Sequence, residues 1–227
     1  MEPGPLDAAV SDRQSPRRLL DSATVFPGKI WDVVSETFQL DAAGEPITRE
    51  YIQHPGAVAI LAMDGEERVL LLRQYRHPVR MDLWEIPAGL LDVDGEDFVD
   101  AAARELAEEA DVAAGTWHVL TDLFLSPGSS SEALRIYLAQ NITEVPHAER
   151  HTRTHEEAEI EFAWVPLQDA VQAVLEGRIH SPSAAAAVLA AAAARQSGYR
   201  SLRPADAPWP EHPSQHGTWP QGPVLRD

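Results

Sequence analysis

The chain has 227 residues, 44% of them hydrophobic, which is enough for one substantial core. It contains no cysteine, which excludes disulfide bonds, thiolate zinc sites and cysteine nucleophiles. Its 36 acidic and 18 basic residues give a formal charge of −18, which argues against nucleic-acid binding. The first 20 residues do not resemble a secretory signal, and no run of about 20 apolar residues suits a membrane helix. We therefore expect a soluble cytoplasmic protein that binds neither nucleic acid nor membranes.

The pattern of residues divides the chain into four parts. From the N-terminus we expect a mobile arm (1–20), a β-rich region (21–56), a main domain (57–200) and an extended or disordered proline-rich tail (201–227). Apolar and β-branched runs predict strands at 29–40, 45–54, 57–63, 68–75, 117–125, 134–139 and 160–165. Helical periodicity or propensity predicts helices at 97–110, 167–176 and 183–195. Strands interspersed with helices indicate an α/β or α+β sandwich.

Three glutamates gather near the end of the first predicted helix. Glu105 and Glu109 are four residues apart and share one face, with Glu108 beside them. Like charges at this spacing oppose helix formation, and Arg104 alone cannot neutralise three carboxylates. A divalent cation could, because magnesium favours carboxylate oxygens together with water and substrate phosphates. The alternative is a solvated acidic face.

The residues before this helix favour the metal site. Gly89 opens a loop that leads through Glu96 to the helix, and the whole segment resembles the Nudix box, GX5EX7REUXEEXGU. There are two departures: six residues instead of five separate Gly89 from Glu96, and Asp111 stands where the pattern has glycine. The extra residue falls in the loop and leaves the helix register unchanged. Asp111 takes a position where glycine commonly forms a left-handed helix cap, which aspartate tolerates better than most residues.

Flanking segments are similar to the ADP-ribose pyrophosphatase branch of the Nudix hydrolases, of the actinobacterial type. They are RQYR at 73–76, WEIPAG at 84–89 and LSPGSSSE at 125–132. The resemblance implies a Nudix α/β/α sandwich at 57–200, preceded by a β-rich dimerisation region at 21–56. It also implies a homodimer in which the two subunits exchange their N-terminal regions.

The resemblance further implies a role for individual residues. Magnesium, with Mn²⁺ as a substitute, would bind the main-chain carbonyl of Ala88 and the side chains of Glu105 and Glu109, with Glu108 assisting. Glu96 and Arg104 would brace the loop and helix. The base for the attacking water would be Glu156 or Glu157, unless the metal-bound water needs none. The substrate would contact Arg76, Glu85, Ser126, Pro127, Gly128 and Glu132.

Several alternatives stay open. Arg76 could instead form a surface ion pair, and Trp31 could either stack on a nucleobase or belong to the core. His147, His151 and His155 recur at helical spacing, but neighbouring residues favour a loop over a histidine metal site. The expected reaction is hydrolysis of ADP-ribose to AMP and ribose 5-phosphate. The alternatives are another nucleoside diphosphate derivative, such as NADH, a nucleotide sugar or FAD, and a non-catalytic nucleotide sensor.

Overall fold

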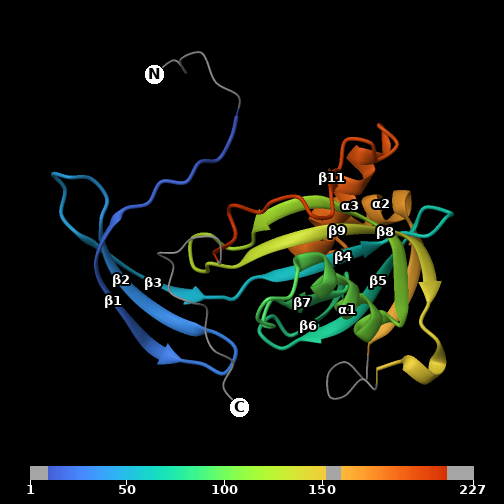
Figure 1. The fold of residues 1–227 in the computed structure, drawn as a ribbon, viewed down its shortest axis with the longest axis horizontal. Helices are drawn as coiled ribbons and strands as arrows, with labels where there is room; N and C mark the ends of the chain where they lie inside the picture. Colours follow the sequence, from blue (N-terminus) through green and yellow to red (C-terminus); the bar gives the residue numbers. More distant parts are fainter. Residues whose placement is uncertain (1–9, 152–159, 214–227) are drawn as a thin grey trace.

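The computed structural model describes residues 10–151 and 160–213, in which a small β-sheet stands apart from a larger α/β body (Figure 1). The small sheet is antiparallel, with the order β1-β2-β3, formed by β1 (Arg18–Pro27), β2 (Asp32–Gln39) and β3 (Ile47–Gln53). The sequence predicts β2 and β3 but not β1, whose first three residues fall in the expected mobile arm. Two register shifts interrupt the pairing of β1 with β2. The apolar side chains of β1 therefore do not alternate regularly between the two faces of the sheet.

A five-stranded sheet forms the centre of the larger body. Its order is β11-β8-β9-β4-β7, and only β4 and β9 pair in parallel within it. The strands are β4 (Ala57–Ala62), β7 (Ala88–Leu90), β8 (Val112–Phe124), β9 (Ala133–Glu144) and β11 (Arg203–Pro204). Every residue of β4 is buried, as its uninterrupted apolar sequence predicts for a strand covered on both faces.

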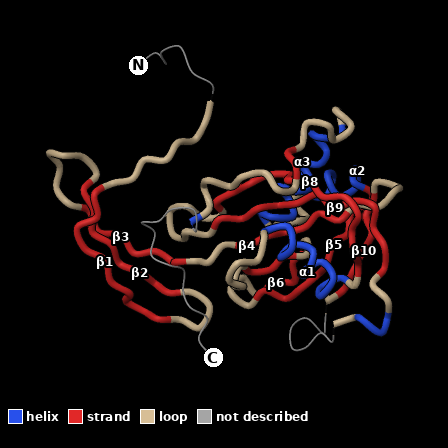
Figure 2. Tube along the Cα trace, viewed as in Figure 1, coloured by secondary structure: helices blue, strands red, loops and turns tan. Residues whose placement is uncertain are grey.

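A second, three-stranded antiparallel sheet lies beside it (Figure 2). Its order is β10-β5-β6, formed by β5 (Arg68–Arg76), β6 (Met81–Glu85) and β10 (Glu161–Pro166). Val69, Leu70, Leu71 and Leu72 are buried in β5, so the predicted buried strand is confirmed.

Helices cover both faces of the central sheet. Ala57, Ala59 and Leu61 of β4 pack in a core with α2 (Leu167–Leu175) and α3 (Pro182–Arg195). Val58 and Ile60 point the other way, into a second core with α1 (Phe98–Ala110). This alternation places α1 and the α2–α3 pair on opposite sides, which confirms the predicted α/β/α sandwich. None of the helices in the described ranges is both long and apolar enough to cross a membrane.

The C-terminal segment differs from its prediction. Residues 203–213 do not extend away from the domain: β11 pairs with β8, and the side chain of Trp209 is only 3% exposed. The proline content excludes a helix here but does not prevent the segment from packing on a preformed surface.

Candidate active site

Helix α1 carries the glutamate cluster and is fixed by its opposite face. Ala101, Ala102 and Leu106 are fully buried against the central sheet, and the glutamates lie on an adjacent face of the helix, toward β7. Asp97 occupies the N-cap position, as predicted, but its side chain makes no capping hydrogen bond. The helix ends at Asp111, whose φ of 55° and ψ of 28° are left-handed. The aspartate therefore keeps the backbone geometry that glycine provides in the Nudix pattern.

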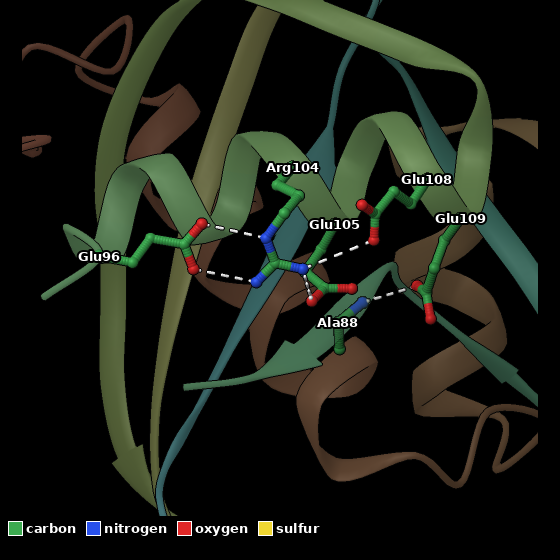
Figure 3. Close-up of polar contacts among 6 residues, drawn as sticks. All are labelled: Ala88, Glu96, Arg104, Glu105, Glu108 and Glu109. Carbon is green, nitrogen blue, oxygen red and sulfur yellow. Dashed lines mark hydrogen bonds and ion pairs between the residues drawn. The ribbon is translucent and has the colours of Figure 1, made fainter. Parts of the chain in front are cut away.

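Arg104 lies at the centre of the cluster (Figure 3). Its Nε and Nη2 donate to the two carboxylate oxygens of Glu96 at 3.0 and 2.9 Å. Its Nη1 donates to Glu105 at 2.6 Å and reaches Glu108 at 3.5 Å. These hydrogen bonds, first of all those with Glu96, raise the pKa of Arg104, and they lower the pKa of Glu96. The guanidinium thus joins the loop that carries Glu96 to the helix, which supports the predicted bracing role.

Glu105 and Glu109 approach the short strand β7 from α1. Glu105 is largely buried, and this desolvation raises the pKa of its carboxyl against the opposing effect of Arg104. Glu109 accepts a hydrogen bond of 2.9 Å from the backbone N–H of Ala88. Gly89 provides the space into which the carboxylate of Glu105 fits. Figure 3 shows Ala88 beneath these side chains, so the structure brings the four predicted metal-binding residues together.

These residues fit a hard divalent cation chemically. They supply carboxylate oxygens in a partly desolvated place where burial already disfavours the charge of Glu105. No group of three carboxylate or histidine side chains among the described residues is arranged as a ready metal cluster. Instead, Arg104 bonds to Glu105 and Glu108, so a cation would compete with the guanidinium for their oxygens.

Arg76 and Glu85 form another polar pair, on the sheet β10-β5-β6. Arg76 ends β5 and Glu85 ends β6, and their side chains meet across this hairpin. Arg76 Nε lies 3.0 and 3.2 Å from the two carboxylate oxygens of Glu85, and Nη2 lies 2.6 Å from Oε2. The residue Glu85 is buried, whereas the side chain of Arg76 is 43% exposed. Glu85 therefore orients a guanidinium that remains accessible.

The loop at Ser126–Gly128 is connected to the small sheet. The carbonyl of Ser126 accepts hydrogen bonds of 2.9 Å from the N–H groups of both Ser129 and Ser130. The next residues hold the end of β3: Ile52 N–H donates to Ser129, and Ser131 N–H donates to Ile52, each at 2.9 Å. Pro127 lies in this turn. Beyond it, burial raises the pKa of the Glu132 carboxyl.

Trp31 is not a core residue. It is 41% exposed, and its ring stacks on that of His54 with centroids 5.8 Å apart and an angle of 26°. The His54 residue is 8% exposed; its Nδ1 accepts from the N–H of Gly56, and its own N–H donates to Ser131 Oγ. Sequence reasoning missed His54, because one histidine at the end of a strand carries no pattern.

Three predicted residues are not located. His155, Glu156 and Glu157 lie outside the described residues, so the predicted base stays a prediction. His147 lies in a short 3₁₀ turn, His147–Glu149, where the sequence predicts a loop.

Comparison with known proteins identifies the family. The Nudix domain family matches residues 53–186, more than half of the chain. The chain is 42% identical to the ADP-ribose pyrophosphatase of Mycobacterium tuberculosis over 195 residues, which are 86% of this chain and 92% of that protein. It is 32% identical to the ADP-ribose pyrophosphatase of Bacillus subtilis over 164 residues, 72% and 86% of the two chains. The chain therefore belongs to the Nudix family, which confirms the family predicted from the box.

A solved structure supports the same fold. The crystal structure of an ADP compounds hydrolase matches with a TM-score of 0.66 at 20% identity, over 84% of this chain and 100% of that one. At this identity the likeness concerns the fold alone.

Proposed function

We propose that this Nudix hydrolase cleaves ADP-ribose with water to give AMP and ribose 5-phosphate. The observation that carries the proposal is that α1 places Glu109 on the backbone N–H of Ala88 and holds Glu105 and Glu108 beside it through Arg104. The two relatives named above are both ADP-ribose pyrophosphatases, which supports this substrate over other diphosphates.

The cofactor of this class of enzyme is a divalent metal ion, and we assign magnesium, with Mn²⁺ as a substitute. Ala88, Glu105 and Glu109 would hold it, with Glu108 assisting. When bound, the metal neutralises charge on the diphosphate and lowers the pKa of the attacking water. Arg104 keeps the carboxylates in place through Glu96 and Glu105. Glu156 or Glu157 would accept the proton of the attacking water, whose oxygen forms the new P–O bond as the bridging P–O bond breaks.

The remaining roles concern substrate binding. Arg76, oriented by Glu85, would contact phosphate or ribose oxygens, because a planar guanidinium matches them well. Trp31, which is 41% exposed, would provide an aromatic ring on which adenine stacks. The turn at Ser126, Pro127 and Gly128, with Glu132 after it, would border the same substrate.

The assembly is proposed to be a homodimer that exchanges the N-terminal sheet. Every residue of β1 is exposed, including Leu19, Val25 and Phe26, and such an apolar surface is typical of an interface. Sedimentation equilibrium of the full chain would give twice the monomer mass, whereas a monomer at micromolar concentration would contradict the assignment. The cytoplasmic location stays a prediction.

One substrate panel tests the reaction. ADP-ribose, NADH, FAD and a nucleotide sugar are incubated with magnesium, and nucleoside monophosphate release is followed, with EDTA as the blank. Glu109→Gln should lower ADP-ribose turnover by about 10²-fold or more while leaving the circular dichroism unchanged. Faster cleavage of another substrate would replace ADP-ribose. Nucleotide binding without product under any divalent metal would support the sensor instead.

A further inference from the structure

The C-terminal segment 203–213 crosses the edge of the central sheet and ends beside the catalytic loop, defined here as residues 90–97. Its first residues form β11, in which Arg203 pairs with Val119 and Pro204 pairs with His118 of β8. Arg203 also donates to Asp122 at 2.8 Å. The segment, which Figure 1 draws in red, is therefore anchored before it reaches α1.

The buried side chain of Arg135 binds the middle of this segment. Arg135 of β9 is 1% exposed, and its guanidinium forms hydrogen bonds of 2.8 and 3.0 Å with Asp122. It also donates to the segment: the carbonyls of Ala207 and Pro208 accept at 2.7 and 3.1 Å. Because a buried guanidinium needs all its donors satisfied, Arg135 selects the bound position of this backbone.

Trp209 carries the contact onward to the helix. Its ring lies 4.8 Å from the guanidinium carbon of Arg135 on one side. On another side it meets Phe98 edge-on, with centroids 5.1 Å apart. His212 packs on both rings, at 4.6 Å from Trp209 and 5.1 Å from Phe98. Phe98 is the first residue of α1, two positions after Glu96, so the segment holds the point where the catalytic loop becomes helix.

The same segment also lies close to the residue that bonds the other end of the catalytic loop. Gly56 lies so near His212 that a β-carbon on it would come within 2.3 Å of Nε2. The carbonyl of Gly56 accepts a hydrogen bond of 3.1 Å from the N–H of Leu91. The segment thus contacts the first residue of α1, directly after the loop, and lies beside Gly56, which is hydrogen-bonded to Leu91 in the loop.

We infer that residues 203–213 form a C-terminal clamp that positions the catalytic loop and the start of α1, with Trp209 as its positioning residue. The clamp acts through Phe98 on the neighbouring Glu96, whose pairing with Arg104 places Glu105. Loosening the clamp should weaken the metal site and slow the chemical step, while the affinity for substrate at the Arg76 side changes little. The kinetic part of this inference rests on the proposed function.

The test compares Trp209→Ala with Trp209→Phe, which keeps an aromatic ring against Arg135 and Phe98. Val188→Ala is the control for a general loss of stability, because Val188 is fully buried in the other core, with α2 and α3. Trp209→Ala should lower kcat by about 10- to 100-fold and raise the magnesium concentration for half-maximal rate, with KM nearly unchanged. Trp209→Phe should recover most of the rate, and Val188→Ala should stay near the wild type.

Hydrogen–deuterium exchange gives a reading that does not depend on activity. In Trp209→Ala, amides of residues 90–104 should exchange faster while those of β5 keep their protection. Equal acceleration throughout, or none at 90–104, overturns the clamp. If the wild type does not hydrolyse ADP-ribose, the proposed function fails, yet this exchange pattern still decides on the clamp. Should Trp209→Ala not fold, Phe98→Leu, which removes the ring between segment and helix, is measured in the same way.

Discussion

Gly89 lies so close to the carboxylate of Glu105 that a β-carbon at residue 89 would stand 1.9 Å from the Cδ of Glu105 and 2.2 Å from Oε1. No flexible surface side chain makes this contact, since Glu105 is largely buried between β7 and Arg104. The glycine is therefore required by the position of a predicted metal ligand, and backbone freedom is a lesser reason for it.

Gly89→Ala tests this relationship. The methyl group would push the Glu105 carboxylate out of its place, and we expect kcat with magnesium to fall by about 10²-fold, because small displacements of catalytic groups have effects of this size. The melting temperature should change much less, since α1 is held by its opposite face. Gly65→Ala is the matched control, because a β-carbon there meets nothing within 4 Å. Unchanged kcat in Gly89→Ala would mean that Glu105 does not act from this position.

Arg104→Lys should uncouple the loop from the helix. A lysine keeps the positive charge but cannot make the two-pronged contact with both oxygens of Glu96. We expect a loss of about tenfold in kcat and a higher magnesium requirement. In a double-mutant cycle with Glu96→Gln, the second substitution should lower kcat only a little further once the first is made. The reason is that both substitutions remove the same interaction, between Arg104 and Glu96. Fully additive losses would show that the two residues act separately.

Local patterns account for what the sequence predicts correctly. The apolar run of β4 and the spacing of Ala101, Ala102 and Leu106 each contain their own burial signal. The Nudix spacing then places the glutamates together on one side of α1, and even the unusual Asp111 keeps the expected left-handed cap. These features depend on residues a few positions apart, which is the range over which periodicity is informative.

Contacts between distant segments account for what the sequence does not predict. The docking of residues 203–213 depends on Arg135 and Phe98, which are far away in the chain, and nothing near Trp209 indicates either partner. In the same way, β1 becomes a strand through pairing with β2, and His54 is buried by meeting Trp31 and the loop at Ser131. Proline content and single histidines say little about such long-range contacts.

Glu85→Gln should affect substrate binding more than catalysis. The neutral amide would hold Arg76 through weaker hydrogen bonds, and the guanidinium would lose its fixed orientation. We expect the KM for ADP-ribose to rise by about tenfold, with kcat within a few-fold and an unchanged magnesium requirement. Arg76→Lys should give a similar KM, since the lysine cannot make the two-pronged contact. If Glu85→Gln lowers kcat with no change in KM, this pair belongs to the chemistry and not to binding.

His54 should make stability depend on pH. Burial lowers its pKa from the ordinary 6.5 to about 4, so between these values the unfolded chain binds a proton that the folded chain resists. The free energy of unfolding should therefore decrease as the pH falls from 6.5 toward 4, by up to about 3 kcal/mol from this residue, with no penalty above 6.5.

His54→Asn isolates this contribution, because the amide oxygen can still accept the hydrogen bond from the N–H of Gly56 but cannot titrate. Urea unfolding at several pH values between 4.5 and 7 gives the slope for each protein. The carboxylates contribute equally to both, so the difference between the two slopes belongs to His54. We expect the wild type to be steeper by up to about 1.4 kcal/mol per pH unit, the effect of one proton. Parallel curves would mean that burial does not lower the pKa of His54 in the folded protein.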